Sequence, residues 1–278
     1  MTLSHSTLLP DDDHAGEMLQ LLLSGVQEVL GDNLVGVYLR GSLALGDFQP
    51  GSSDLDFLVA TRSPVTAETI ADLNGLHDRL ARIPNPYAHE LEGTYIDQAA
   101  LRTFQEERQF PTLSRGETLR LAVHRSNWVL ERWTVREHGI TLLGPDPKTL
   151  IDPISKEHIR SAVSDRLRDW AAWCDQPDDP AWQRPLHHLA YVVETMCRAL
   201  YTLDGGEMCS KPRAVEWALR TLPQPWHALV EQSRSWRADN VTTPDEASIA
   251  EVRRFIRWMN EGRFRFMPHG SNRNTARY

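Results

Sequence analysis

Two kinds of hydrophobic pattern divide this chain of 278 residues, and this division is what most constrains its fold. Short segments rich in β-branched residues, bounded by glycine and proline, are confined to the first half. From Ser155 onward almost every segment has apolar residues at helical spacing, interrupted by prolines. Alternating patterns predict strands, and patterns with a period near 3.6 residues predict helices. We therefore predict an α+β domain with a mixed sheet and helices over residues 1–148, followed by an all-α helical-bundle domain over residues 149–278.

The individual elements follow from the same patterns. In the first half we expect a short mixed sheet with helices against it, formed by strands at 34–39, 53–60 and 89–96 and helices at 14–30 and 63–82. A long helix is expected over 117–138, carrying His124, Trp128 and Trp133, and a short strand or turn over 139–147 serves as a hinge. The second half predicts helices at 155–174, 186–203, 211–221, 225–237 and 244–262, with a frayed end over 263–278.

Composition excludes several classes of protein. The formal net charge is −8, whereas a protein that grips a phosphate backbone over a broad surface is usually basic, so no nucleic-acid partner is expected. The three cysteines (Cys174, Cys197 and Cys209) lack metal-type spacing and disfavour a disulfide framework. The apolar runs are too short to span a bilayer, and the start shows no signal-peptide pattern. We expect a cytoplasmic protein with no membrane partner.

The segment Asp54-Leu55-Asp56 is the first candidate for chemistry. Side chains of a strand alternate between faces, so Asp54 and Asp56 would share one face while Leu55 points into the core. Two carboxylates on one face repel each other unless a cation lies between them. Hard oxygen ligands on a rigid strand suit Mg²⁺. Taken alone, the pattern is also typical of a solvated strand face.

The Gly41-Ser42 segment strengthens the prediction of a metal site at Asp54 and Asp56. Gly41-Ser42 ends the preceding predicted strand and can offer backbone N–H groups and a hydroxyl to a terminal phosphate. A third acidic strand, with Glu90 and Glu92, is expected behind the Asp54–Asp56 strand. A phosphate-binding turn beside a two-carboxylate metal site predicts a site for a nucleoside triphosphate.

These segments resemble a known family. VYLRGSLALGDFQPGSSDLDFLV, at residues 37–59, is similar to the signature of the polymerase-β-like nucleotidyltransferases, and more narrowly to the aminoglycoside adenylyltransferases of the streptomycin/spectinomycin kind. The other matching segments, in the family's order, are 91–94 (third acidic strand), 136–138 with 143–145 (inter-domain joint), and 198–201, 210–211 and 214–218 (C-terminal helical domain). The resemblance covers roughly residues 15–240.

The resemblance implies an enzyme that uses Mg²⁺ and the co-substrate ATP to transfer AMP to a hydroxyl of a small molecule, with release of pyrophosphate. The acceptor would be aminoglycoside-like or another aminocyclitol or sugar compound. Asp54 and Asp56 would hold Mg²⁺. Glu92 would be the third carboxylate, acting as general base and touching the metal, with Glu90 as its rival on the same strand face.

The resemblance also assigns the phosphate contacts. Gly41 and Ser42 would bind the terminal phosphates, and Arg198 and Lys211 would bring two cations from the helical domain to the triphosphate. An alternative for Arg198 is an ion pair with Glu194 one turn earlier. Because both halves of the site are present in one chain, a monomer is sufficient.

The acceptor half of the site departs from the family. Residues 182–188 (WQRPLHH) are neutral or basic where the family has carboxylates that recognise the drug. The acceptor and its regiochemistry therefore stay open. An alternative is a regulatory or toxin–antitoxin-type nucleotidyltransferase that modifies a protein or RNA, which the acidic charge and the long helical half disfavour. A silent nucleotide-binding module is disfavoured because Asp54, Asp56 and Glu92 are all present.

Overall fold

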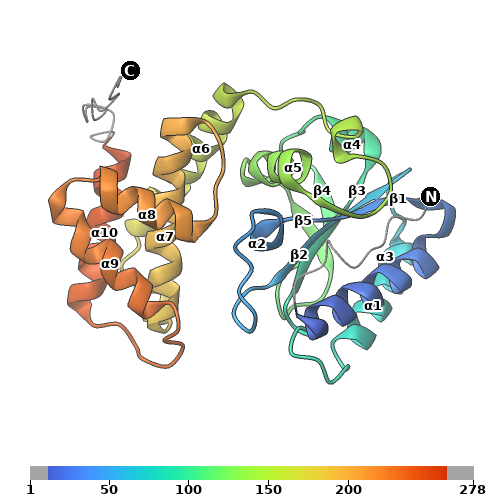
Figure 1. Cartoon of the computed structure of the whole chain (residues 1–278), viewed down its shortest axis with the longest axis horizontal. Coiled ribbons are helices and arrows are strands. Elements are labelled where there is room, and N and C mark those ends of the chain that lie inside the picture. The colour runs from blue at the N-terminus through green and yellow to red at the C-terminus, as the bar shows by residue number, and fades with distance from the viewer. Residues whose placement is uncertain (1–11, 262–278) are drawn as a thin grey trace, which may run out of the picture. The chain divides into compact units, whose positions relative to one another are not determined.

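The computed structural model describes residues 12–261 of the chain (Figure 1). The first eleven residues and the tail for which a frayed end was predicted lie outside this range. The chain divides into two compact units, one before and one after the Ala162–Val163 bond. No helix in the described range is both long and apolar enough to cross a membrane. The domain boundary expected at 148/149 stays a prediction.

The first unit contains a six-stranded mixed sheet with strand order β5-β4-β3-β2-β1-β6. Its strands are β1 (Leu34–Leu39), β2 (Leu55–Thr61), β3 (Leu91–Asp97), β4 (Gln109–Leu113), β5 (Arg120–Val123) and β6 (Ile140–Leu143). The pair β2–β3 is parallel, and the other neighbours are antiparallel. The predicted mixed sheet is confirmed, as are its three expected strands, and the expected hinge strand becomes β6, an edge strand beside β1.

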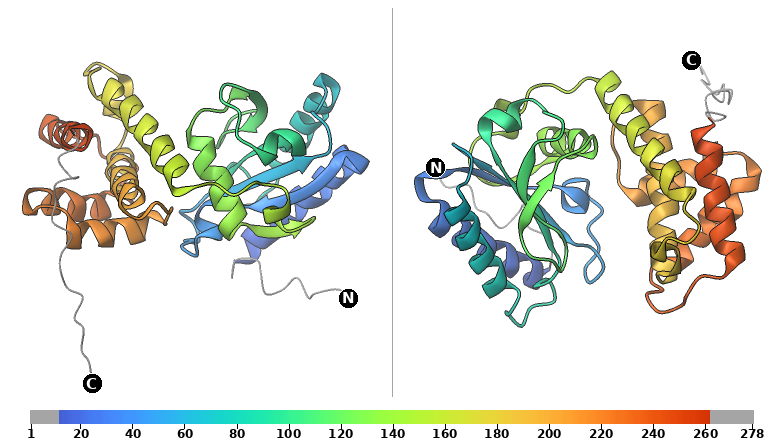
Figure 2. Two further views of the ribbon diagram at one scale, coloured as in Figure 1. Left: turned by 90° about the horizontal axis from the view of Figure 1, so that it is seen from above. Right: turned by 180° about the vertical axis from the view of Figure 1, so that it is seen from behind.

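Helices cover both faces of this sheet (Figures 1 and 2). Helices α1 (Asp13–Leu30) and α3 (Ala67–Leu80) lie on one face, and α4 (Gln98–Arg102) and α5 (Asn127–His138) lie on the other. Strand alternation divides the core between them: Phe57 packs into the cluster under α1 and α3, whereas Leu58 packs into the cluster under α5. Phe57 therefore points into the larger core, and the face of Leu58 is the one that carries the site.

The helix expected over 117–138 is wrong in its first third. Leu119, Leu121 and Val123 recur at a period of two, and residues 120–123 form β5, whose backbone pairs with β4. The backbone N–H of His124 continues this pairing by donating to the Arg108 carbonyl at 2.9 Å. The helix itself begins only at Asn127. His124 therefore stands at the end of a strand and not on a helix.

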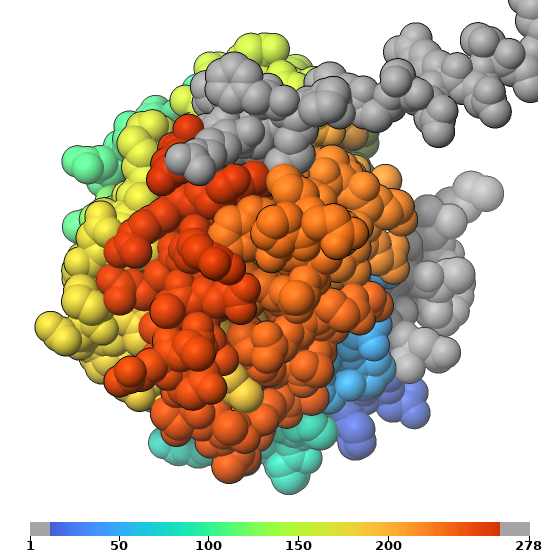
Figure 3. All heavy atoms as spheres, turned by 90° about the vertical axis from the view of Figure 1, so that its left-hand side faces the viewer, coloured from blue at the N-terminus to red at the C-terminus, as the bar shows by residue number. Residues whose placement is uncertain are grey.

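The second unit is all-α, as predicted. Its helices are α6 (Lys156–Cys174), whose first turns belong to the first unit, α7 (Leu186–Gly205), α8 (Lys211–Thr221), α9 (His227–Trp236) and α10 (Glu246–Asn260). Helix α7 packs against α8, α9 and α10 through a fully buried side that includes Leu189, Val193 and Leu200. Figure 3 shows side chains of α10 (red) beside those of the α8–α9 segment (orange). The three cysteines are buried and form no disulfide.

Candidate active site

Three neighbouring strands bring Arg40, Asp56 and Glu92 together at one end of the sheet. Arg40 follows β1, and its backbone N–H donates to the Asp56 carbonyl at 3.0 Å. Asp56 and Glu92 are direct register partners in the parallel pair β2–β3, so their side chains share a face. Tyr38, two residues before Arg40, packs on the α5 face of the sheet, and alternation puts Arg40 on that same face. The predicted proximity of Asp56 and Glu92 follows from this register.

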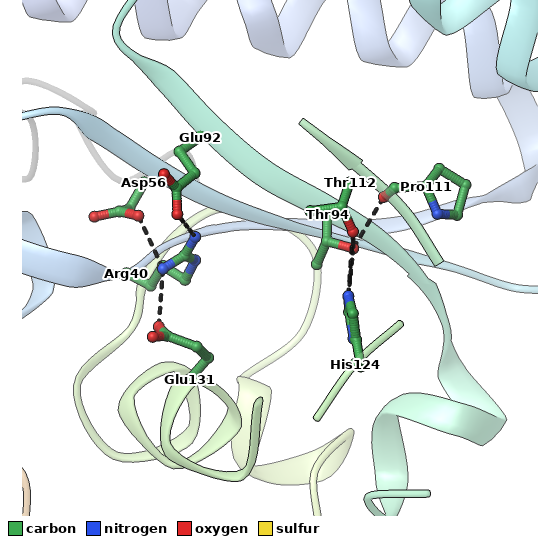
Figure 4. A network of polar contacts seen from close by, with 8 residues as sticks. All are labelled: Arg40, Asp56, Glu92, Thr94, Pro111, Thr112, His124 and Glu131. Atoms are coloured by element: carbon green, nitrogen blue, oxygen red, sulfur yellow. Dashed lines mark hydrogen bonds and ion pairs between the residues drawn. The ribbon is translucent and has the colours of Figure 1, made fainter. Parts of the chain in front are cut away.

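The guanidinium of Arg40 lies at the centre of the cluster (Figure 4). Its Nη1 is 2.8 Å from Asp56 Oδ1, and its Nη2 is 3.4 Å from Glu92 Oε1. From the opposite side, Glu131 of α5 places its Oε2 at 2.8 Å from the same Nη1. Burial disfavours the charged form of Arg40, but the carboxylates of Asp56, Glu131 and Glu92 outweigh it and raise its pKa. Arg40 is therefore a permanent, buried cation among carboxylates.

The cluster carries more negative charge than Arg40 can neutralise. Burial raises the pKa of Asp56, Arg40 opposes this, and the nearby charges of Asp54, Glu92 and Glu131 add to it. Burial likewise raises the pKa of Glu92, with Arg40 again opposing and Asp54 adding. Removing a carboxylate from water and surrounding it with like charges both disfavour its ionised form. A second cation at this position would relieve that repulsion.

Asp54 takes part through its charge and not through the strand geometry that was expected. Strand β2 begins at Leu55, so Asp54 precedes it, and alternation along the strand orders only Asp56. Within residues 12–261, no three histidine, cysteine, aspartate or glutamate side chains converge as a metal-holding group. Asp56 and Glu92 converge on the Arg40 guanidinium instead.

Gly41 and Ser42 open the short helix α2 (Gly41–Ala44), whose first residue adjoins the Asp56 carboxylate. Gly41 has φ +61°, and a Cβ atom at this position would lie 1.8 Å from Asp56 Oδ2, so only glycine lets the backbone approach so closely. The Oγ of Ser42 is buried and has no hydrogen-bond partner. A buried hydroxyl left without a partner costs free energy unless a ligand completes it.

These observations test whether the residues fit Mg²⁺ and a triphosphate. The donors are carboxylate oxygens, the ligands that Mg²⁺ prefers, and their summed charge exceeds that of Arg40. The Ser42 hydroxyl, next in sequence to the glycine that adjoins Asp56, is an unpartnered donor suited to a phosphate oxygen. The chemistry of the donor set therefore fits a divalent cation with an anionic ligand.

Two aromatic residues from the segment 117–138 are packed beneath the cluster. Trp128 and His124 are both buried, and their rings stack at a centroid distance of 3.7 Å and an angle of 7°. His124 Nε2 lies 3.2 Å from the Thr112 hydroxyl and 3.4 Å from that of Thr94. The guanidinium carbon of Arg40 is 5.6 Å from the Trp128 ring centroid. These side chains support Arg40 and offer no open face to a ligand.

The two glutamates of the third acidic strand separate into different surroundings. Glu90 precedes β3 and forms an ion pair with Arg115 at 2.5 Å. Glu92 lies within β3 and contacts Arg40. The geometry thus favours Glu92 over Glu90 as the carboxylate of the cluster.

The second unit contains the two cations expected at the phosphates. Arg198 lies within α7, and Lys211 is the first residue of α8, with its Nζ 4.2 Å from the ring centroid of Tyr191. The alternative partner of Arg198 is already engaged, because Glu194 accepts two hydrogen bonds from Arg237, at 2.9 and 2.6 Å. Among the described residues, no ion pair joins Glu194 to Arg198.

Sequence reasoning did not single out Arg40 and Glu131. A signal for Arg40 existed, because it stands two positions after Tyr38 on the face that carries Asp56. For Glu131 no signal existed: a glutamate on a helix is ordinarily solvated, and only the packing of α5 over the sheet brings it to Arg40.

Comparison with known proteins agrees with this architecture. Residues 21–115 match the nucleotidyltransferase domain family, and residues 149–261 match the family described as "aminoglycoside adenylyltransferase, C-terminal domain". The spectinomycin 9-adenylyltransferase of Campylobacter jejuni is 23% identical over 261 residues, which cover 88% of this chain and 94% of that protein. The aminoglycoside (3'') (9) adenylyltransferase of Escherichia coli is 25% identical over 221 residues, which cover 75% of this chain and 80% of that protein.

A solved structure shares the fold. The crystal structure of spectinomycin adenyltransferase AAD(9) from Enterococcus faecialis, with ATP and spectinomycin, superposes with a TM-score of 0.70 at 19% identity and covers 90% of this chain and 99% of that one. The two domain matches together span most of the chain and occur in the order that this fold requires. The chain therefore belongs to the aminoglycoside adenylyltransferase family of nucleotidyltransferase enzymes.

Proposed function

We propose that this enzyme transfers AMP from Mg–ATP to a hydroxyl of a small molecule, an aminoglycoside-like or other aminocyclitol or sugar compound, and releases pyrophosphate. The observation that carries the proposal is the register pair Asp56–Glu92 beside the unpartnered Ser42 hydroxyl. The relatives that are named for spectinomycin and aminoglycosides, and the related structure with ATP and spectinomycin, support the same reaction class.

On this proposal each residue of the cluster has a role toward the nucleotide. Ser42 donates its hydroxyl hydrogen to a terminal phosphate oxygen, and the absence of a side chain on Gly41 lets the turn stay close to Asp56. Asp54, Asp56 and Glu92 would hold Mg²⁺, which when bound neutralises charge on the departing pyrophosphate. Arg198 and Lys211 would supply further positive charge to the triphosphate.

Glu92 is the proposed general base. The acceptor hydroxyl gives its proton to the Glu92 carboxylate while its oxygen forms a bond to the α-phosphorus. The bond from that phosphorus to the bridging oxygen breaks, and the electron pair leaves with pyrophosphate. Burial raises the pKa of Glu92, which makes it a better proton acceptor near neutral pH than an exposed glutamate.

A radiolabelled-ATP assay tests the proposal. The protein is incubated with Mg²⁺ and a panel of aminoglycosides, spectinomycin and cell metabolites, and pyrophosphate release that depends on an acceptor is measured. Asp56→Asn, which removes charge but keeps shape, should lower the rate at least about a hundredfold. Asp152→Asn is the matched control, because Asp152 pairs with the exposed Arg102 outside the cluster. If the wild-type rate equals that of Asp56→Asn on every acceptor, the proposed reaction is wrong.

A further inference from the structure

We propose that Arg40 is a built-in countercation that competes with the divalent metal for Asp56 and Glu92, and that Glu131 receives Arg40 when the metal displaces it. On this view the site binds free metal weakly and binds it well only when a nucleoside triphosphate brings it. The inference rests on the proposed function, because the metal concerned is that of Mg–ATP.

The first step is the overlap of the two cations. Arg40 hydrogen-bonds the Asp56 carboxylate at 2.8 Å and contacts that of Glu92 at 3.4 Å. A magnesium ion binds carboxylate oxygens at about 2.1 Å. A guanidinium and a metal ion bound to the same two carboxylates would repel each other strongly in this buried place. Metal binding therefore requires Arg40 to give up at least part of these contacts.

The second step is where Arg40 can go. Its Nη1 already lies 2.8 Å from Glu131 Oε2, on the side away from the strands (Figure 4). A small movement toward α5 would keep this pair while releasing Asp56. The Nε of Arg40 is buried without a hydrogen-bond partner, so the movement breaks no bond at that atom. Glu131 thus prevents the displaced guanidinium from becoming an unpaired buried charge, which would be strongly unfavourable.

The consequence is a dependence of metal affinity on the nucleotide. Free metal must displace Arg40 and gains only the carboxylate oxygens of the site as ligands. A triphosphate contributes its own oxygens to the metal and its own negative charge near the displaced arginine. Arg40 is therefore a positioning residue. It orders the carboxylates before ATP binds, and it disfavours binding of metal in the absence of nucleotide.

The test is the binding of Mn²⁺ to the full chain without nucleotide. Binding is measured from the electron paramagnetic resonance signal of the Mn²⁺ that stays free. Arg40→Met removes the competing charge and should bind Mn²⁺ at least about tenfold more tightly than the wild type, because charge-assisted hydrogen bonds no longer have to be broken. Arg40→Lys keeps a cation that cannot span two carboxylates, so it protects the fold and should still tighten binding about threefold. Arg102→Met, outside the cluster, is the matched control and should leave Mn²⁺ binding unchanged.

Glu131→Gln should act in the opposite direction, weakening Mn²⁺ binding about threefold or more, because Arg40 then has no alternative carboxylate. A direct electrostatic effect of Glu131 on the metal would have the same sign, and a double-mutant cycle separates the two. If Glu131 acts through Arg40, Glu131→Gln has little effect in the Arg40→Met background, where no cation is left for Glu131 to receive. An effect of Glu131→Gln that has the same size in the wild-type and Arg40→Met backgrounds overturns the role of Glu131 as the receiving partner.

Unchanged or weaker Mn²⁺ binding by both Arg40 variants would overturn the competition itself, whichever reaction the enzyme catalyses. The proposed function fails separately, if the wild type releases no pyrophosphate with any acceptor. Adding ATP gives a further readout, because the difference between Arg40→Lys and wild type in Mn²⁺ binding should then shrink.

Discussion

Gly41→Ala should damage the fold and the site together, because the added methyl group would occupy the place of the Asp56 carboxylate. Two costs can be separated. The first is backbone strain: a non-glycine residue at φ +61° costs about 1 kcal/mol. The second is the clash, since the new Cβ would lie 1.8 Å from Asp56 Oδ2, where ordinary contacts begin near 3.4 Å.

The clash can be relieved only by moving Asp56. A shift of about 1.6 Å, the difference between these distances, would take Asp56 out of hydrogen-bond range of Arg40, now 2.8 Å away. Breaking a buried ion pair costs roughly 3–5 kcal/mol, and partial relaxation lowers this. We therefore expect Gly41→Ala to lose about 3 kcal/mol of stability and to lower the melting temperature by about 6 °C or more.

Gly46→Ala is the matched control for this experiment. Gly46 lies just after α2 with φ +74°, and a Cβ atom there would meet nothing within 4 Å. Gly46→Ala should therefore introduce only the backbone strain, which lowers the stability by about 1 kcal/mol and the melting temperature by about 2–4 °C. Both variants are followed by thermal unfolding in circular dichroism and by the pyrophosphate assay. A Gly41→Ala protein that melts within about 2 °C of Gly46→Ala would refute the close approach of the turn to Asp56.

Three further outcomes are expected. Ser42→Ala removes a buried hydroxyl that has no partner, so the free energy of unfolding in urea should stay the same or rise by up to about 1 kcal/mol, while the KM for ATP should rise about tenfold. Burial lowers the pKa of His77 to about 4 and of His124 to about 3, below the unfolded value of about 6.5, so their contribution to stability is full above pH 6.5. Lowering the pH from 6 to 5 should therefore reduce the free energy of unfolding by somewhat under 3 kcal/mol through these two histidines together. His124→Phe keeps the stacked ring but cannot titrate, so it should halve this loss. An unchanged loss would mean that His124 titrates normally. Lys211→Ala should weaken ATP binding in calorimetry, whereas Lys148→Ala should not, and equal affinities would remove the phosphate role of Lys211.

Local pattern was sufficient for most of the fold, and its failure has a physical cause. The strand at residues 34–39 and the helix at 211–221 appear at their predicted bounds, because each has a clear period and clear punctuation at both ends. The helix expected at 117–138 failed at residues 120–123, where the period of two covers only Leu119, Leu121 and Val123 and is too short to identify a strand by itself. The backbone groups of residues 120–123 are satisfied by β4, and this strand lay outside the prediction. A non-local partner decided the structure of that segment.

The candidate site shows the same boundary between local and non-local information. Asp56 and Glu92 were predictable as neighbours, because alternation and parallel pairing are regular. The conclusion that buried carboxylates on one face require a cation was physically sound. The further step, that this cation is a metal ion, did not consider a side-chain cation. Arg40 was already available on that face by the same alternation, two positions after Tyr38. The repulsion argument therefore constrains charge and not chemical identity: before a metal is assigned to paired carboxylates on a strand, the arginines and lysines on the same face of adjacent strands must be counted.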